Sequence, residues 1–322
     1  MINETILYIS MFLGSCLVFY FSGELIVKSL IKIARFLGWK EFVVSFLIMA
    51  FVGSLPNLSV GIASALNNIP QLSFGEVIGG NVIDLTLAIA LAAIFAKKGI
   101  PAKSKTVHDT LFFTVIAAIA PILLIWDGIL SRADGLILIG FFLIYVVWLF
   151  SKKERFSKVC EDEKSITQSF KTSFSGVFKV VLCIILFIIA AQGIVTSANY
   201  FAIAFNWPIA LIGLFIVGLG NCVPEIFFAI SSARKGMEWM ILGDLMGTVV
   251  APATLVLGIV ALINPIVIND FSPFFLARIF LFIAIFFFFI FIKNDSRISK
   301  KEAVVLLMIY IIFILSEMFF RL

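Results

Sequence analysis

The sequence predicts an all-α integral membrane protein with ten transmembrane helices in two inverted five-helix repeats, whose helices break at the midplane. Three observations predict this fold class. Hydrophobic residues make up 62% of the chain and charged residues only 13%, and the mean hydropathy is +1.17. Ten apolar segments are each close to the roughly 20 residues that a membrane helix needs. One stretch of sequence also occurs twice, 168 residues apart.

The apolar segments leave no length for a separate soluble domain. They are expected near residues 5–31, 42–66, 72–96, 109–126, 135–150, 176–200, 208–233, 239–263, 272–292 and 303–320. The first segment is longer than a bilayer requires, so we expect it to tilt. Because it lacks a basic leader and a small-residue cleavage site, we interpret it as a retained helix.

The internal repeat aligns residues 45–57 with residues 213–225 and continues without a gap into the next segment. Five helices precede the charged stretch at 151–175, and five follow it. Because five is an odd number, the second half enters the membrane from the opposite side, which makes the repeat inverted. We therefore expect a first repeat at 1–150, a linker at 151–175 and a second repeat at 176–322.

Basic residues occur in alternate loops, which indicates the orientation. Loops at 32–41, 97–108, 151–171, 234–238 and 293–301 are basic, whereas the intervening loops contain no lysine. By the positive-inside rule, both termini lie outside and the 151–175 linker is cytoplasmic, with the plasma membrane the expected location. The net charge of +5 is therefore a topology signal, and we expect no nucleic-acid partner.

Each copy of the repeated stretch contains a proline in mid-segment, Pro56 and Pro224. A helix proline removes the hydrogen bond to the carbonyl four residues earlier, which makes the oxygens of Val52 and Gly220 available as ligands for hard cations. Unwound backbone inside a membrane is tolerated where it is buried in protein or lines a cavity. An ordinary kink is the alternative, but prolines at equivalent positions favour an ion site.

Acidic residues lie next to these prolines. Glu225 follows Pro224 directly, and Asp84 lies deep in the third segment. An intramembrane carboxylate costs on the order of 3 kcal/mol, so it indicates a functional site; a protonated acid bonded to a neighbouring helix is the structural alternative. Glu76 and Asp244 are matched across the repeat. Because they lie nearer the starts of their helices, a helix N-terminal role and an ion-binding role remain equally open for them.

Four short motifs resemble the sodium/calcium exchanger family, part of the calcium/cation antiporters. They are Gly53-Ser54-Leu55-Pro56-Asn57, Gly79-Gly80-Asn81-Val82-Ile83-Asp84, Gly220-Asn221-Cys222-Val223-Pro224-Glu225 and Gly247-Thr248-Val249-Val250-Ala251-Pro252. The resemblance implies ten helices in two inverted halves, with ions held by helices 2, 3, 7 and 8. It also implies that helices 1 and 6 slide as a gate and that calcium is exchanged for sodium.

The chain departs from the family pattern at several ligand positions. Asn57 stands where the family has an acid, Pro252 stands where a polar residue is expected, and some hydroxyl positions are lost. Fewer anionic oxygens weaken calcium binding relative to sodium or protons, because calcium affinity follows ligand charge and number. Two carboxylates still match one divalent ion. The expected cation ligands are Asp84, Glu225, Asn57, Ser54, Asn221 and Thr248, with Glu76 and Asp244 as further candidates.

The favoured function is a secondary antiporter that exchanges Ca²⁺ for Na⁺ by alternating access, not an enzyme. A proton-coupled or monovalent cation exchanger and a transport-dead scaffold remain alternatives. A passive channel is disfavoured because no ring of like groups is evident. No cofactor is expected; the partners are inorganic cations (Ca²⁺, Na⁺ and H⁺) and the lipid bilayer. Cys16, Cys183 and Cys222 lie in apolar segments and are interpreted as packing residues.

Overall fold

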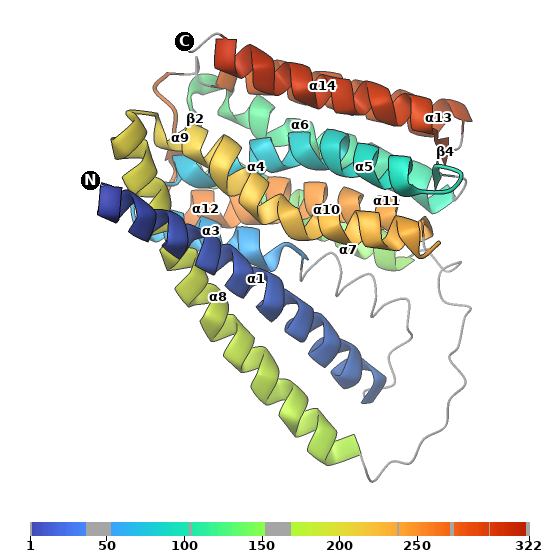
Figure 1. Ribbon diagram of the computed structural model, residues 1–322, viewed down its shortest axis with the longest axis horizontal. Helices are drawn as coiled ribbons and strands as arrows, with labels where there is room; N and C mark the ends of the chain where they lie inside the picture. Colours follow the sequence, from blue (N-terminus) through green and yellow to red (C-terminus); the bar gives the residue numbers. More distant parts are fainter. Residues whose placement is uncertain are drawn as a thin grey trace.

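A computed structural model describes residues 2–36, 53–102, 105–151, 169–236, 238–270, 274–295 and 297–319. Within these ranges, nine helices are long and apolar enough to cross a membrane, and a shorter apolar helix spans Leu55–Leu66. The predicted fold class is confirmed (Figure 1). The start of the predicted second segment, including Val52, and most of the predicted linker lie outside the described residues.

The first half of the chain contains the elements up to residue 151. They are α1 (Ile2–Phe36), α3 (Leu55–Leu66), α4 (Gln71–Ile83), η1 (Asp84–Ala88), α5 (Ile89–Phe95), β1 (Ile100–Pro101), α6 (Lys105–Leu124), η2 (Ile125–Asp127), β2 (Ile129–Leu130) and α7 (Arg132–Ser151). The segments α4, η1 and α5 form one continuous helix, which is the predicted third transmembrane segment.

The second half contains the elements from residue 169 onward. They are α8 (Ser169–Phe205), α9 (Ile209–Ile212), η5 (Gly213–Val217), α10 (Gly218–Arg234), α11 (Trp239–Ala251), η6 (Pro252–Val256), α12 (Leu257–Ile263), β3 (Ile266–Val267), α13 (Phe275–Asp295), β4 (Arg297–Ile298) and α14 (Lys300–Phe319). Because α8 begins at Ser169, it includes the last residues of the segment expected to be the linker.

Two helix starts share a capping box and preserve the repeat register. Ser131 N donates to Asp134 Oδ2 over 2.8 Å before α7, and Ser299 N donates to Glu302 Oε2 over 2.7 Å before α14. In both boxes the serine hydroxyl accepts a hydrogen bond from the backbone N–H of the acid. The two boxes lie 168 residues apart, so the offset found in the first motifs extends to the last helix of each half.

Two short antiparallel strand pairs demonstrate the inversion. Ile100 of β1 pairs with Ile298 of β4, whereas Ile129 of β2 pairs with Val267 of β3. The helix α6 separates β1 from β2, so the two pairs lie at opposite ends of the molecule (Figure 1). The loop after α5 therefore lies at one end and its repeat equivalent, the loop after α12, at the other.

The central helices are interrupted by π-helical turns. The turns η1 and η6 occupy equivalent positions in the two halves, and η5 interrupts the helix that leads to Pro224. Such turns often accompany functional sites. The expectation of unwound backbone at Pro224 is wrong, because this residue lies inside α10. Pro56 lies in the first turn of α3, where a proline needs no donor.

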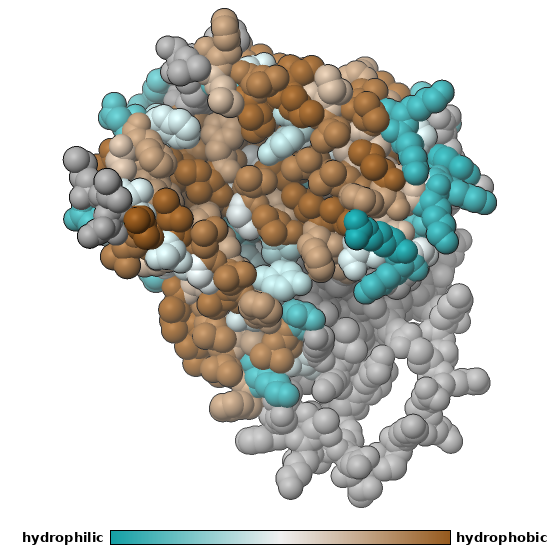
Figure 2. All heavy atoms as spheres, viewed as in Figure 1, coloured by the Kyte–Doolittle hydropathy of each residue, from teal (hydrophilic) through white to brown (hydrophobic). Residues whose placement is uncertain are grey.

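The helix α4–η1–α5 and the helix α11–η6–α12 form the centre of the molecule. In Gln71–Phe95 and in Ile241–Ile263, 78% of the residues in an 18-residue apolar stretch are buried. The corresponding share is 22% in Glu4–Ile26 and 28% in Lys300–Phe319. Exposed apolar side chains cover much of the outer surface, which appears brown in Figure 2. This distribution is that of a membrane bundle, whose outside faces lipid and whose polar groups face inward.

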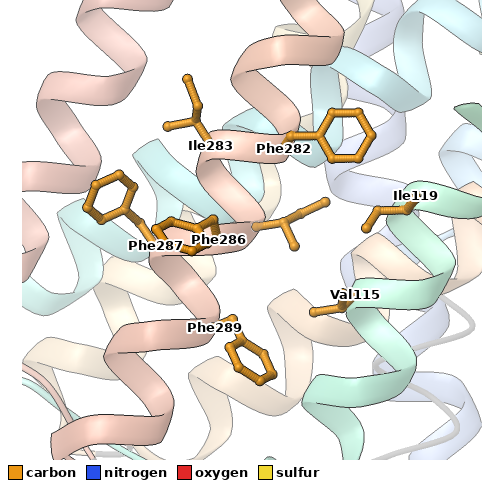
Figure 3. A pocket seen from close by; sticks show the side chains of 8 residues that line it. Val115, Ile119, Phe282, Ile283, Phe286, Phe287 and Phe289 are labelled. Atoms are coloured by element: carbon orange, nitrogen blue, oxygen red, sulfur yellow. The ribbon is translucent and has the colours of Figure 1, made fainter.

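An apolar groove lies between α6 and α13 on the outer surface. Figure 3 shows its lining, to which α6 contributes Val115 and Ile119 and α13 contributes a run of phenylalanine and isoleucine residues. Phe286 is 60% exposed, whereas Phe288 is 1% exposed. The phenylalanine run therefore has two roles, since part of it faces the outside of the bundle and part packs inside.

The helix formed by α4 crosses the α9–η5 segment at glycines. A Cβ atom on Gly75 would collide with the carbonyl oxygen of Ala210, one on Gly79 with that of Leu214, and one on Gly213 with that of Leu72. Only glycine allows the two backbones to approach so closely. This crossing joins the first half of the chain to the second beside the acidic residues.

We predict that Gly75→Ala destabilises the protein because the added methyl group separates α4 from α9. The expected cost is about 1–3 kcal/mol, as for other overpacked sites, and it is measured as a lower thermal unfolding midpoint of the purified protein in detergent. Gly243→Ala is the matched control, because Gly243 is the repeat equivalent and a Cβ there meets no atom of the described residues within 4 Å. Equal midpoints for the two variants would contradict the prediction.

Candidate cation-binding site

The two acids singled out by the sequence converge in the interior. Asp84 begins the π-helical turn η1 in the first half, and Glu225 lies in α10 of the second half. Their side chains are 3% and 9% exposed, and the two carboxyl groups are near enough to interact electrostatically. Acids from the two halves of the chain therefore lie in the same part of the interior, and their joint binding of an ion stays a prediction.

Thr248 links Asp84 to the second half of the chain. Its hydroxyl group donates to Asp84 Oδ2 over 3.0 Å and also lies 3.1 Å from the carbonyl oxygen of Leu245 in its own helix, α11. Thr248 is buried. The hydroxyl group therefore orients one oxygen of Asp84 and leaves the other oxygen, Oδ1, facing the interior without a donor among the described residues.

Asn221 of α10 connects three helices. Its side-chain nitrogen, Nδ2, donates to Asn57 Oδ1 over 3.2 Å and to Glu76 Oε1. Asn57 belongs to α3 and Glu76 to α4. Asn221 and Glu76 are both buried, with Glu76 only 1% exposed. One amide group thus links α3, α4 and α10.

Glu76 and Asp244 lie farther along their helices than was expected for residues near the helix starts. Each is the sixth residue of its helix, and neither occupies the first turn. Asp244 is partly buried and interacts electrostatically with Asp84 and Glu225. Neither residue is therefore placed to stabilise a helix N-terminus, and their binding of an ion stays a prediction.

Ser54 and Gly220 mark the two proline-containing motifs. Ser54 precedes α3 and lines a small hollow with Leu58, Ala251, Leu255 and Val256. The carbonyl oxygen of Gly220 has no α-helical N–H partner, because the fourth residue after it is Pro224. The two motifs thus offer a hydroxyl oxygen and a backbone carbonyl oxygen as further candidate ligands.

One residue at the site was not predicted from the sequence. Cys222, interpreted as a packing residue, is buried and interacts electrostatically with the acids, and its thiol lies 3.8 Å from the carbonyl oxygen of Gly80. Asn81, in the helix that leads to Asp84, is 1% exposed and its Nδ2 has no acceptor among the described residues. The repeat contained a signal for Cys222, because its equivalent is Ser54, a predicted ligand.

Several buried oxygens at the site have no hydrogen-bond donor in the part of the chain that the structure describes. They are Glu76 Oε2, Asp84 Oδ1, Asn221 Oδ1 and Glu225 Oε2. Buried polar atoms normally have partners, so this group of acceptors fits a cation. Among the described residues, no three His, Cys, Asp or Glu side chains lie close enough to hold a metal ion. A bound cation would therefore need neutral oxygens beside the carboxylates.

A comparison with models of protein families tests the family resemblance that the four motifs suggest. The family model described as "Sodium/calcium exchanger protein" matches residues 7–151 and 175–319. The chain belongs to the sodium/calcium exchanger family. The predicted resemblance is therefore confirmed, and the family relationship makes this member a multi-pass membrane transporter of inorganic cations.

Individual relatives of this family member extend over most of its length. The sodium/calcium exchanger MaX1 of Methanosarcina acetivorans is 26% identical, with 96% of this chain and 98% of MaX1 covered. An uncharacterized membrane protein of Methanocaldococcus jannaschii is 28% identical over 76% of this chain and 78% of that protein. Structures of the sodium-calcium exchanger NCX_Mj, soaked with Na⁺ and Sr²⁺, share the fold with a TM-score of 0.66, at 23% identity, over 97% of this chain and 99% of NCX_Mj.

We predict that Thr248→Val destabilises this family member, because it leaves Asp84 Oδ2 buried without its donor. The expected cost is about 1–3 kcal/mol, as for other buried unsatisfied groups, and thermal unfolding in detergent measures it. Thr248→Ser keeps the hydroxyl group and should unfold close to the wild-type midpoint. A valine variant as stable as the serine variant would show that the bond contributes nothing.

Proposed function

We propose that this protein is a secondary antiporter that exchanges Ca²⁺ for Na⁺ by alternating access. The observation that carries the proposal is the convergence of Asp84 and Glu225 from opposite inverted halves, each with one buried oxygen that lacks a donor among the described residues. An intramembrane carboxylate is costly, and a cation bound between the two would offset that cost. A site shared by both halves is the arrangement that alternating access requires.

The composition of the site supports a hard cation as the transported ion. Its candidate ligands are oxygens of carboxylates, amides, hydroxyl groups and backbone carbonyls, which suit Ca²⁺ and Na⁺ better than softer metals. The two carboxylates of Asp84 and Glu225 match the charge of one Ca²⁺ ion. The names of MaX1 and NCX_Mj, both sodium/calcium exchangers, agree with this choice.

We further propose that the helices α1 and α8 move together as the gate. They lie side by side (Figure 1), and Phe19 of α1 contacts Phe187 of α8, its repeat equivalent, with ring centroids 5.3 Å apart. The local two-fold axis therefore passes between these rings. Tyr8 and Tyr200 also stack, with centroids 4.0 Å apart. The helix α1 contacts α10 of the candidate site, because its Phe12 and Cys16 lie next to Gly220.

For the orientation, we keep both termini outside and the 151–175 linker in the cytoplasm, within the plasma membrane. Lys97 and Lys98 precede β1. Lys293 precedes its partner β4, and Arg297 lies in β4, so this end of the molecule is basic. Hydrophilic residues gather on the right in Figure 2, at the end where β4 lies in Figure 1. The opposite end carries Asp127 and Asp134 near β2, which fits the positive-inside rule.

The experiment that tests the function is calcium flux into proteoliposomes under an imposed ion gradient. We expect an outward sodium gradient to drive calcium uptake, and Glu225→Gln to abolish it, because that variant loses one of the two central charges. Glu302→Gln is the matched control, since Gln can replace Glu in the capping box that Glu302 forms with Ser299 far from the site. Full activity in Glu225→Gln would remove the site as described.

The same assay distinguishes sodium-coupled calcium exchange from the alternative functions. Calcium uptake that ignores the sodium gradient but follows a pH gradient would refute sodium coupling and favour exchange with protons. Sodium or potassium flux without any calcium flux would instead favour a monovalent cation exchanger. A transport-dead scaffold would give no flux under any of these gradients.

We predict that Gly220→Cys permits reversible locking of the gate. A Cβ at Gly220 would lie 3.2 Å from the sulfur of the native Cys16, which is close to the spacing that a disulfide needs. Oxidation should join α1 to α10 and stop transport, and a reductant should restore it, as followed by calcium flux.

The control for the gate joins α1 to α8 instead. A Cβ at Gly193 would lie 3.5 Å from the Cβ of Ser15, so Ser15→Cys combined with Gly193→Cys can form a disulfide within the proposed moving unit. Transport should persist after oxidation of this double variant. Transport by fully oxidised Gly220→Cys at the wild-type rate would contradict the gate.

A further inference from the structure

The groove between α6 and α13 is lined by valine, isoleucine and phenylalanine and opens to the outside of the bundle. Its volume is about 530 Å³, within the range of about 300–1,000 Å³ that small-molecule pockets occupy. Figure 3 shows its two walls, with Val115 and Ile119 on α6 and Phe282, Phe286 and Phe289 on α13. Phe282 is 41% exposed and Phe286 is 60% exposed. In a membrane, the groove therefore opens toward lipid acyl chains.

On α13, the residues of the groove form one line that ends in a lysine. Phe282, Phe286, Phe289 and Lys293 follow each other at intervals of four, three and four residues, the spacing that places side chains on one helix face. The nitrogen Nζ of Lys293 lies 5.7 Å from the centre of the Phe289 ring, and Lys293 is exposed. A positive charge therefore lies at one end of the apolar line.

This lysine belongs to the basic end of the molecule. The helix α13 leads into β4, which pairs with β1 shortly before α6 begins, so α6 and α13 run antiparallel. Lys97, Lys98 and Arg297 are also exposed at this end. Three acids at the same end, Asp109, Glu238 and Glu302, are half-buried. The exposed charge around Lys293 therefore favours an anionic group at this end of the groove.

The length of the line matches one leaflet of a bilayer. Lys293 lies 11 residues after Phe282, which is about 16 Å along the helix axis at about 1.5 Å per residue. Half of a hydrocarbon core of about 30 Å is about 15 Å. A phospholipid whose phosphate group meets Lys293 can therefore extend one acyl chain along the whole line.

The headgroup has to provide most of the selectivity among lipids. An acyl chain gains little by leaving other acyl chains for apolar side chains, because the two environments are equally apolar. A lysine near the membrane surface, in contrast, attracts anionic lipids. A long lysine side chain at a helix end can also extend into water without a ligand, so the charge of the lipid is the variable that a test has to change.

We propose that the groove between α6 and α13 binds one anionic phospholipid of the leaflet at the basic end. One acyl chain lies along Phe282, Phe286 and Phe289, and the phosphate group contacts Lys293. This site is additional to the transport function and does not depend on which ions are exchanged. Since α13 also packs against α4 and η1, the helix that carries Asp84, the lipid supports the outer side of a helix that borders the candidate cation site.

The test measures lipid binding by native mass spectrometry of the purified protein in detergent. Protein stripped of lipid should retain one phosphatidylglycerol, with a dissociation constant about fivefold lower than for phosphatidylcholine, equivalent to the contribution of about 1 kcal/mol from one lysine. Lys293→Gln should abolish this preference. Lys235→Gln is the matched control and should keep it. Lys235 is exposed and follows Arg234, whose guanidinium lies over the Phe95 ring at the same end of the molecule, but it does not line the groove.

A second pair of variants tests the groove itself. Val115→Trp fills the groove from α6 and should lower the retention of phosphatidylglycerol. Val181→Trp adds the same side chain to α8, where Val181 is 50% exposed, and should leave the retention unchanged. Thermal unfolding midpoints without lipid, compared with that of the wild-type protein, establish that each variant is folded.

Each outcome decides for or against the proposal. Equal affinity of the wild-type protein for the two lipids overturns it, and so does a preference for phosphatidylglycerol that persists in folded Lys293→Gln. Unchanged retention in folded Val115→Trp overturns it as well, because the lipid then binds elsewhere. If Val115→Trp does not fold, Lys293→Gln decides alone. A dimer that Val115→Trp converts to a monomer would assign the groove to a second copy of the chain and overturn the lipid site.

Discussion

The structure depends on keeping carboxyl groups at the centre of a membrane protein. A charged acid there costs on the order of 3 kcal/mol or more unless hydrogen bonds, neighbouring dipoles or a cation offset the cost. Asp84 receives one hydrogen bond from Thr248, and Glu76 receives one from Asn221. The remaining oxygens of these acids have no donor among the described residues, so a bound cation would lower the cost of keeping them charged.

Close helix packing and π-helical turns make this arrangement feasible. Gly75, Gly79 and Gly213 bring the backbones of α4 and the α9–η5 segment into direct contact, so that side chains just beyond the crossing can meet across the two halves. The turn η1 starts at Asp84, and its equivalent η6 starts at Pro252. Because a π-helical turn adds a residue to one turn of the helix, it changes the direction in which the following side chains point. The same backbone feature is thus kept in both halves although only one of them keeps the acid.

The two halves have preserved their framework and diverged at their centre. The capping boxes at Ser131 and Ser299 and the strand pairs at the two ends follow the repeat closely. At the site, in contrast, Asn57 opposes Glu225 and Asn221 opposes Gly53 across the pseudo-symmetry. Selection for a fold requires equivalent backbones in both halves, whereas a site on the axis is shared, so its ligands need to be present only once. An asymmetric ligand set in a symmetric framework follows from this difference.

The sequence by itself determined the membrane class, the helix segments, the inverted repeat and the two central acids, because hydropathy, an odd helix count and buried charge are properties of the chain. Only the tertiary structure decided which groups meet. The contacts of Asn221 with Asn57 and Glu76, and the position of Cys222 among the acids, depend on how each helix is rotated and where it crosses its neighbours. The π-helical turns alter that rotation, and no periodicity in the sequence marks them. Pro224 was misjudged for the same reason, since packing by neighbouring helices keeps α10 helical through a residue that would break an isolated helix.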